Sequence, residues 1–132
     1  MKLNGQCHCG TVTFEVRFDT PTVVYECNCS ICRLQAYQHL IVMKKDFTLI
    51  SGEENLTEYR FNTRVARHTF CRTCGVKSFY TPRSHPDCVS VNWRSISKDG
   101  LGTQASAISM EMFDGVNWEG SVAKLQSLST KT

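Results

Sequence analysis

Hydrophobic and polar residues alternate along several short stretches of the chain, and this pattern predicts β-strands. The clearest alternation covers residues 11–18. Its apolar members would face one side of a strand and its polar members the other, as in a strand with one buried face. The apolar members are Val12, Phe14, Val16 and Phe18. A proline-containing turn at residues 19–21 follows, so the strand is expected to end there.

Other apolar or alternating runs predict further strands, and the polar stretches between them predict turns. Strands are expected at residues 22–26, 39–43, 47–50, 56–62, 68–70, 77–80, 88–93 and 105–112. Turns or loops are expected at residues 19–21, 44–46, 51–55 and 81–87. Helix is a minor element, with one turn at residues 33–38 and a short helix beginning near Asn117 that carries Trp118, Val122 and Leu125 on one face. The pattern therefore predicts a mostly β fold of short antiparallel strands.

The length of the chain favours one domain. A chain of 132 residues with 41% apolar residues can build a single modest core. We expect that domain at residues 1–126 and a frayed tail at 127–132. Neither a signal peptide nor an apolar run of about 20 residues is recognised, so we expect no membrane association and a cytoplasmic or nuclear location.

Eight cysteines are the most informative part of the composition, because a reducing compartment favours metal sites over disulfides. Three of them lie within six residues, in Cys27-Asn28-Cys29-Ser30-Ile31-Cys32. Such close spacing suits disulfide geometry poorly, whereas thiolates from one turn can converge on a soft divalent ion. Three protein ligands are also the number typical of a zinc site that accepts a substrate atom as its fourth ligand.

Two further pairs of cysteines flank this motif, one in Cys7-His8-Cys9-Gly10 and one in Cys71-Arg72-Thr73-Cys74-Gly75. A glycine follows each pair, as expected where the chain turns back around an ion with positive φ. Together the pairs predict a four-thiolate structural site. The spacing does not distinguish zinc from iron there. Cys88 is left over and is expected to be an ordinary buried residue.

The charge of the chain argues against nucleic acid as a partner. The formal charge is +3 with neutral thiols. Four thiolates with Zn²⁺ contribute −2 and three contribute −1, so the metal-loaded chain comes to about zero. The only local basic concentration comprises Arg60, Arg64, Arg67 and His68. A solvated strand edge is the favoured interpretation of it, and a phosphate or carboxylate site is the alternative.

Taken together, the cysteine motifs resemble those of the glutathione-dependent formaldehyde-activating enzyme family. The resemblance covers roughly residues 5–120 and carries three motifs in order: Cys-His-Cys-Gly, Cys-Asn-Cys-Ser-Ile-Cys and Phe-Cys-Arg-Thr-Cys-Gly-Val. The run from Tyr59 to Pro82 looks particularly like the centromere protein V branch. That branch carries a long basic N-terminal extension that this sequence does not show, so its chromosome and microtubule role is carried over only weakly.

The resemblance implies a fold, two metals and a reaction. It implies an Mss4-like β-tent with a structural zinc on Cys7, Cys9, Cys71 and Cys74. It implies a catalytic-type zinc on Cys27, Cys29 and Cys32. The family's reaction joins glutathione and formaldehyde, formally a carbon–sulfur lyase reaction. The implied cofactor is therefore two Zn²⁺ per chain, and the implied partner is a small thiol such as glutathione.

Several side chains near the triple-cysteine motif are candidates for supporting roles. Arg33 follows the last thiol directly and could bind a glutathione carboxylate through a bidentate contact. His39 and His68 are candidates for a fourth metal ligand, although each is more readily explained as a packed strand residue. His8 is expected to point away from the metal, and His85 is expected to be exposed.

Two functional hypotheses follow. In the first, a zinc-held thiol attacks formaldehyde or a related electrophile, because three negative ligands favour thiol activation over carbonyl polarisation. In the second, the chain is a zinc-stabilised, non-catalytic binding module. The sequence shows no general base beside the triple-cysteine motif, which favours the module, whereas an intact three-thiol set favours the enzyme.

Overall fold

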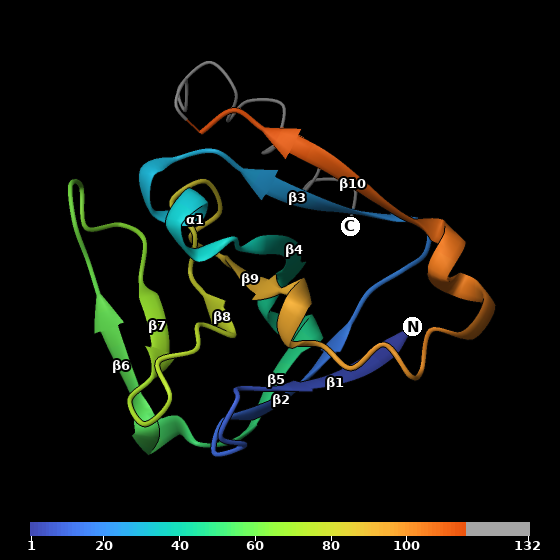
Figure 1. Cartoon of the computed structure of the whole chain (residues 1–132), viewed down its shortest axis with the longest axis horizontal. Coiled ribbons are helices and arrows are strands. Elements are labelled where there is room, and N and C mark those ends of the chain that lie inside the picture. The colour runs from blue at the N-terminus through green and yellow to red at the C-terminus, as the bar shows by residue number, and fades with distance from the viewer. Residues whose placement is uncertain (116–132) are drawn as a thin grey trace.

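The structure is a computed structural model that describes residues 1–115, and it consists mainly of short strands in three small sheets (Figure 1). The first sheet has the order β1-β2-β5 and contains β1 (Lys2–Gln6), β2 (Thr13–Arg17) and β5 (Phe47–Ser51). The second has the order β10-β3-β4-β9-β8 and contains β10 (Ile108–Phe113), β3 (Thr22–Cys27), β4 (Gln38–Met43), β9 (Cys88–Asn92) and β8 (Phe79–Tyr80). The third pairs β6 (Leu56–Tyr59) with β7 (His68–Cys71). The prediction of a mostly β fold is therefore confirmed.

Helical segments are short. In the described part of the chain, one α-helix, α1 (Ser30–Gln35), follows β3, and four short 3₁₀ segments lie between strands. These are η1 (Lys44–Asp46), η2 (Glu53–Asn55), η3 (Trp93–Ser95) and η4 (Gly102–Ala107). Among residues 1–115, no helix has both the length and the apolar character that crossing a bilayer would need.

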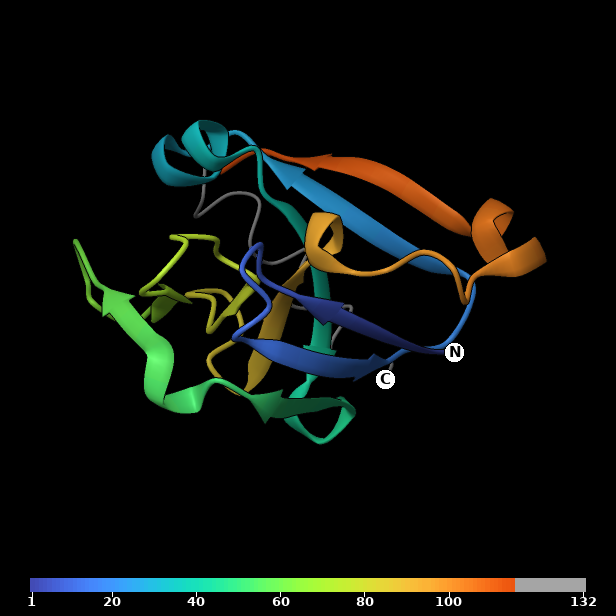
Figure 2. The ribbon, with the colours of Figure 1, turned by 60° about the horizontal axis from the view of Figure 1, so that its bottom comes forward.

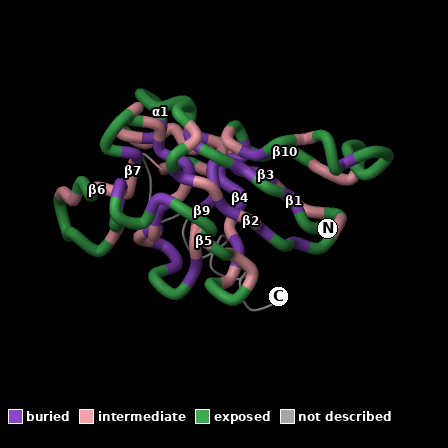
Figure 3. The backbone as a smooth tube through the Cα atoms, turned by 90° about the horizontal axis from the view of Figure 1, so that it is seen from below, coloured by how far each residue is buried: buried purple, intermediate pink, exposed green. Residues whose placement is uncertain are grey.

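The core lies between the first and second sheets, where buried residues run along the inner strands while most connections are exposed (Figures 2 and 3). Phe14 is fully buried at its centre, stacked on Phe47 at 5.5 Å and edge-on to Phe79 at 6.1 Å between ring centroids. Its neighbours Val12, Val16 and Phe18 are also buried, so the alternation predicted for residues 11–18 is confirmed. Burial of such a side chain contributes roughly 1.5–3 kcal/mol.

Among the strands of residues 1–115, pairing is antiparallel with one exception. β10 pairs with β3 in parallel, with Phe113 opposite Cys27 at the end of the ladder (Figures 1 and 2). The expected uniformly antiparallel arrangement is therefore wrong at this pair. A parallel pair requires a long connection. Here most of the chain lies between the two strands, so local sequence could not predict their direction.

Element boundaries differ from the predictions at several places. β8 begins at Phe79 rather than at residue 77, and β10 begins at Ile108 rather than at residue 105. β1 was not expected, although Leu3 and Gly5 alternate with exposed neighbours and are buried against β2. β6 ends at Tyr59 rather than at residue 62. The helical turn expected at residues 33–38 begins earlier, at Ser30, and so includes Cys32. The expected helix near Asn117 and the boundary at residues 126 and 127 lie outside the described residues.

Candidate metal centres and the adjoining cavity

The first thiol group is built by two turns that reverse the chain in the same way. After Cys7 the chain turns through Gly10 at φ 80°, and after Cys71 it turns through Gly75 at φ 76°. Cys7 N–H donates to Val12 O at 3.0 Å, and Cys71 N–H donates to Val76 O at 3.0 Å. The positive φ values confirm why a glycine follows each pair.

The sulfur geometry of this group fits a tetrahedral ion. Four sulfurs held about 2.3 Å from one ion would lie about 3.8 Å apart. Cys9 Sγ lies 3.6 Å from Cys7 Sγ and 3.7 Å from Cys71 Sγ, and Cys74 completes the group. Val12 N–H and the Asn55 side-chain amide donate to sulfurs at 3.4 and 3.3 Å, which stabilises thiolates. These four residues could hold a metal ion, as predicted.

The second thiol group lies where β3 runs into α1. Cys27 ends β3, Cys29 is the N-cap of α1 in extended conformation, and Cys32 lies in its first turn. Residues three apart on a helix share a face, so Cys29 and Cys32 point together. The three sulfurs lie within 4.8 Å of one another, and within the described part of the chain no other side chain joins this group. The predicted set of three is therefore brought together.

The three thiols do not ionise independently. Hydrogen bonds from the Cys27 and Cys32 thiols lower the pKa of Cys29 to about 2. The Cys27 thiol donates a hydrogen bond to Cys29, which raises the pKa of Cys27 to about 11. The Cys32 thiol donates to Cys27 and Cys29, which raises the pKa of Cys32. The three thiols therefore share protons, and a divalent cation has to displace those protons to bind all three sulfurs.

Gly115 closes over this group from the end of β10. A Cβ at this position would lie 2.8 Å from Cys29 Cβ and closer still to Cys27 Sγ. Asn28 N–H donates to Phe113 O at 3.3 Å, which ties the thiol turn to the same segment. The sequence offered no local signal for this contact, because residues 27 and 115 meet only through the parallel β3–β10 pair.

His39 lies against the second group. Its Nε2 lies 3.3 Å from Cys32 Sγ, and its Nδ1 lies 2.8 Å from Ser90 Oγ. Burial lowers the pKa of His39 to about 3, so the ring is neutral. If Cys32 is ionised, Nε2 must be the donor and Ser90 must donate to Nδ1. His39 then stabilises the Cys32 thiolate by a hydrogen bond, and His39 does not join the three-sulfur set.

A cavity of about 390 Å³ opens beside the second group. Its walls combine aromatic and aliphatic side chains with a few polar groups, which is the usual composition of a small-molecule site. The cysteines of the second group and both candidate histidines line it. The other polar lining residues are Ser30, Asn62, Thr63, Arg83 and Ser84, and its aromatic walls are Tyr25, Phe61, Tyr80 and Phe113.

His68 enters the cavity wall from β7 and is held in an aromatic stack. Its ring is stacked on Tyr80 at 4.7 Å and on Phe61 at 5.3 Å between centroids. The Tyr80 hydroxyl is 3.4 Å from His39 Nδ1, so the two histidines are connected through one tyrosine. The sequence alone showed no acid–base group beside the triple-cysteine motif, and the tertiary structure places two there.

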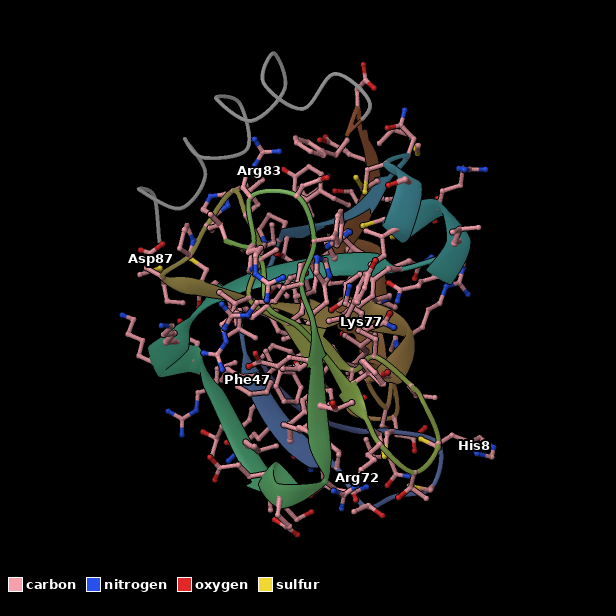
Figure 4. All side chains as sticks on the ribbon, turned by 90° about the vertical axis from the view of Figure 1, so that its left-hand side faces the viewer. His8, Phe47, Arg72, Lys77, Arg83 and Asp87 are labelled. Carbon is pink, nitrogen blue, oxygen red and sulfur yellow. The ribbon has the colours of Figure 1, made fainter. Side chains whose placement is uncertain are left out.

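The remaining predicted residues are distributed around the molecule. Arg33 is exposed and lines a second, smaller cavity of about 230 Å³ on the side of Cys27 and Cys32 that also carries Arg94. His8 projects away from the body of the molecule, as expected (Figure 4). The expected exposure of His85 is wrong, because the fold of the proline loop buries it to 3% exposure beside Ser84. Cys88 is buried, as expected.

One acidic residue, Glu58, pairs with two of the three arginines of the local basic concentration. Arg60 lies 3.2 Å from a Glu58 carboxylate oxygen, and Arg67 also pairs with Glu58. The Arg67 hydrogen bond is the largest cause of the lowered pKa of Glu58. A solvated strand edge is therefore the interpretation that the structure favours for this stretch.

Comparison with known proteins identifies relatives of this chain. A family model described as "Glutathione-dependent formaldehyde-activating enzyme" matches residues 2–114. A curated protein of Halomonas elongata, provisionally named as a glutathione-dependent formaldehyde-activating enzyme, is 33% identical over 82 residues. That match covers 56% of this chain and 52% of the relative, so the matched part spans about half of the relative's length. A crystal structure of a Rhodobacter sphaeroides protein is 34% identical with a TM-score of 0.69, covering 82% of this chain and 98% of that one.

Proposed function

Because the chain belongs to the glutathione-dependent formaldehyde-activating enzyme family, we propose that it is a zinc-dependent enzyme of carbon–sulfur lyase type acting on a glutathione–formaldehyde-like adduct. The observation that carries the proposal is the position of the three-thiol group in the wall of a cavity. A purely structural site would not need to border a cavity of ligand size. The four-thiol group would hold the structural zinc.

The reaction requires a thiol sulfur and a one-carbon electrophile to meet in that cavity. In the adding direction, a sulfur–carbon bond forms, the carbon–oxygen double bond becomes single, and the proton lost by sulfur ends on oxygen. The reverse direction is the lyase reaction, and neither direction changes an oxidation state. Cys27, Cys29 and Cys32 would hold a zinc ion, which when bound would act as a Lewis acid that favours the ionised form of a substrate thiol at neutral pH.

The chain's own residues would bind and orient the substrate. Aromatic and aliphatic walls exclude water from the sulfur, while Asn62 and Thr63 offer hydrogen bonds to a peptide-like substrate. Arg83 in the same wall is suited to a substrate carboxylate. Arg33 remains a second candidate for that role from the smaller cavity behind Cys27 and Cys32. With Cys32 ionised as a metal ligand, His39 would stabilise its thiolate through the Nε2–H hydrogen bond.

A comparison of two cysteine variants tests the proposal. Formation of S-hydroxymethylglutathione from glutathione and formaldehyde would be followed by NMR exchange, with and without the protein. The wild type and the matched control Cys88→Ser, which changes a cysteine outside both thiol groups, should accelerate it. Cys29→Ser should not. Equal rates with Cys29→Ser and the wild type would overturn the proposal.

Metal counting tests the alternative of a non-catalytic zinc-stabilised module of centromere protein V type. An enzyme-type second site should release its zinc first under mild chelation, and glutathione should compete for that site. Native mass spectrometry during chelation would follow both steps. Two zincs of equal inertness, unaffected by glutathione, would favour the module.

A further inference from the structure

Lys77 is a buried cation whose nearest neighbours in the described structure are aromatic rings, an amide and an imidazole. Burial lowers its pKa to about 8, and the nearby thiols of Cys32 and Cys29 partly offset this by raising it. Its side chain is only 5% exposed and lies among other side chains in the interior (Figure 4). No carboxylate contact is recorded for it among residues 1–115. Instead its Nζ lies 3.9 Å from the centroid of the Tyr80 ring and 5.0 Å from that of Tyr37, and it donates to Gln35 Oε1 at 3.2 Å. Burying a charge in this way is costly, so its placement calls for a functional explanation.

The contact between Lys77 and His68 supplies a functional explanation for this buried charge. Lys77 Nζ lies 2.6 Å from His68 Nδ1. An ammonium group can only donate, so Nδ1 must accept, and in a neutral imidazole the proton then resides on Nε2. The pKa of Lys77, which burial lowers to about 8, leaves the ammonium form dominant at pH 7, and the cation–π contacts with both tyrosines favour that form. Burial and the nearby positive charge lower the pKa of His68 to about 4, which agrees with a neutral ring.

The position of the pair decides which edge of the ring meets the substrate. His68 lines the 390 Å³ cavity, whereas Lys77 does not. The two ring nitrogens point to roughly opposite sides, so the edge held by Lys77 faces the interior and the Nε2–H edge remains for the cavity. The ring itself is clamped between Phe61 and Tyr80, so it cannot turn over without breaking both stacks.

We propose that Lys77 is a positioning residue that holds His68 in its Nε2–H tautomer, and that His68 is a catalytic residue that donates a hydrogen bond to the substrate oxygen. In this role His68 is neither a base nor a metal ligand. It stabilises the negative charge that grows on the carbonyl oxygen as sulfur attacks carbon, or that leaves it in the reverse direction. The inference rests on the proposed function and names the residues that handle the oxygen in that reaction.

The tautomer can be measured without any turnover. ¹⁵N-labelled, metal-loaded protein would be studied by long-range ¹H–¹⁵N correlation, in which the two neutral tautomers of an imidazole give different patterns. The wild type should show His68 as Nε2–H. In Lys77→Met, the His68 signals should shift to the Nδ1–H form or to a mixture. Lys98→Met is the matched control, because Lys98 also lies over an aromatic ring, at 4.6 Å from Trp93, and does not contact His68.

Activity provides the second readout. Loss of one oxyanion donor costs about 10²–10³-fold in kcat. Lys77→Met should approach that loss with little change in the KM for the thiol, and Lys77→Arg should recover part of it. An Nδ1–H signal for His68 in the wild type overturns the inference, whether or not the variant folds. A correct tautomer in a protein without formaldehyde activity would instead contradict the proposed function while leaving the Lys77–His68 arrangement intact.

Discussion

The substitution Gly115→Ala should remove the second metal while leaving the fold. The added Cβ would lie 2.8 Å from Cys29 Cβ, whereas ordinary carbon contacts begin at about 3.5 Å. Relief therefore requires a shift of at least about 0.7 Å in the thiol turn, and more at Cys27, whose sulfur is closer. Metal–ligand distances tolerate only about 0.2 Å, so one sulfur would leave its position in the set.

The size of the effect follows from the cost of overpacking. Forcing a methyl group into a filled site costs about 1–3 kcal/mol. If this cost reduces the free energy of metal binding, the affinity of the three-thiol group for the metal is about 5- to 150-fold weaker. The four-thiol group is built from residues 7–9 and 71–74 and should be unaffected.

Competition with a chromophoric chelator would measure both affinities, and native mass spectrometry would count the ions. Wild-type protein should hold two zincs per chain, and Gly115→Ala should hold one at chelator concentrations that leave the wild type loaded. Gly100→Ala is the matched control, because its Cβ would meet only the flexible tip of Leu3. Unchanged affinity at both sites in Gly115→Ala would refute the close approach of Gly115 to the thiols.

Three further predictions concern stability and metal content. Cys29→Ser should lose one zinc with only a small change in melting temperature. Cys71→Ser should lose the other zinc, and its thermal unfolding should no longer be cooperative. Mass spectrometry would count the ions and circular dichroism would follow unfolding, and equal effects of the two variants would contradict the division into a structural and a catalytic-type site. Phe14→Ala should cost about 3–5 kcal/mol in urea unfolding, while Leu34→Ala, at a side chain 79% exposed, should cost little. The pKa of His68 is lowered to about 4 from 6.5, so its contribution to stability is complete above pH 6.5 and is lost as the pH falls toward 4. Between pH 7 and pH 5 the wild type should therefore lose up to about 2 kcal/mol more than His68→Gln in urea unfolding, and parallel losses would refute this.

Local patterns predicted most strands because alternation reports which face of a strand is buried. Residues 11–18 are an example, since Phe14 and Val16 are fully buried where β2 packs into the core. The thiol groups were equally predictable, because Gly10 and Gly75 mark the two turns and Cys32 lies three positions after Cys29. Ligand sets of this kind depend on short separations along the chain. The centromere protein V branch remains a prediction.

Contacts between segments that are distant in the chain could not be predicted from local sequence patterns. The exposure of His85 was predicted wrongly, because the burial of a proline loop depends on which other segments pack over it. β1 was missed because its alternation has only two inward residues, one of them Gly5, and gains meaning only beside β2. The predicted antiparallel direction of β10 was wrong, because its partner β3 lies more than 80 residues earlier in the chain.

The sequence by itself determined that seven cysteines form two groups that could hold metal ions in a mostly β chain, because those groups arise from spacing within tight turns. Only the tertiary structure decided what surrounds the second group. It brought His39 from β4, His68 from β7 and Gly115 from beyond β10 to the same three sulfurs or the cavity beside them. The physical reason is that sheet order sets which strands become neighbours, and sheet order depends on how the whole core packs.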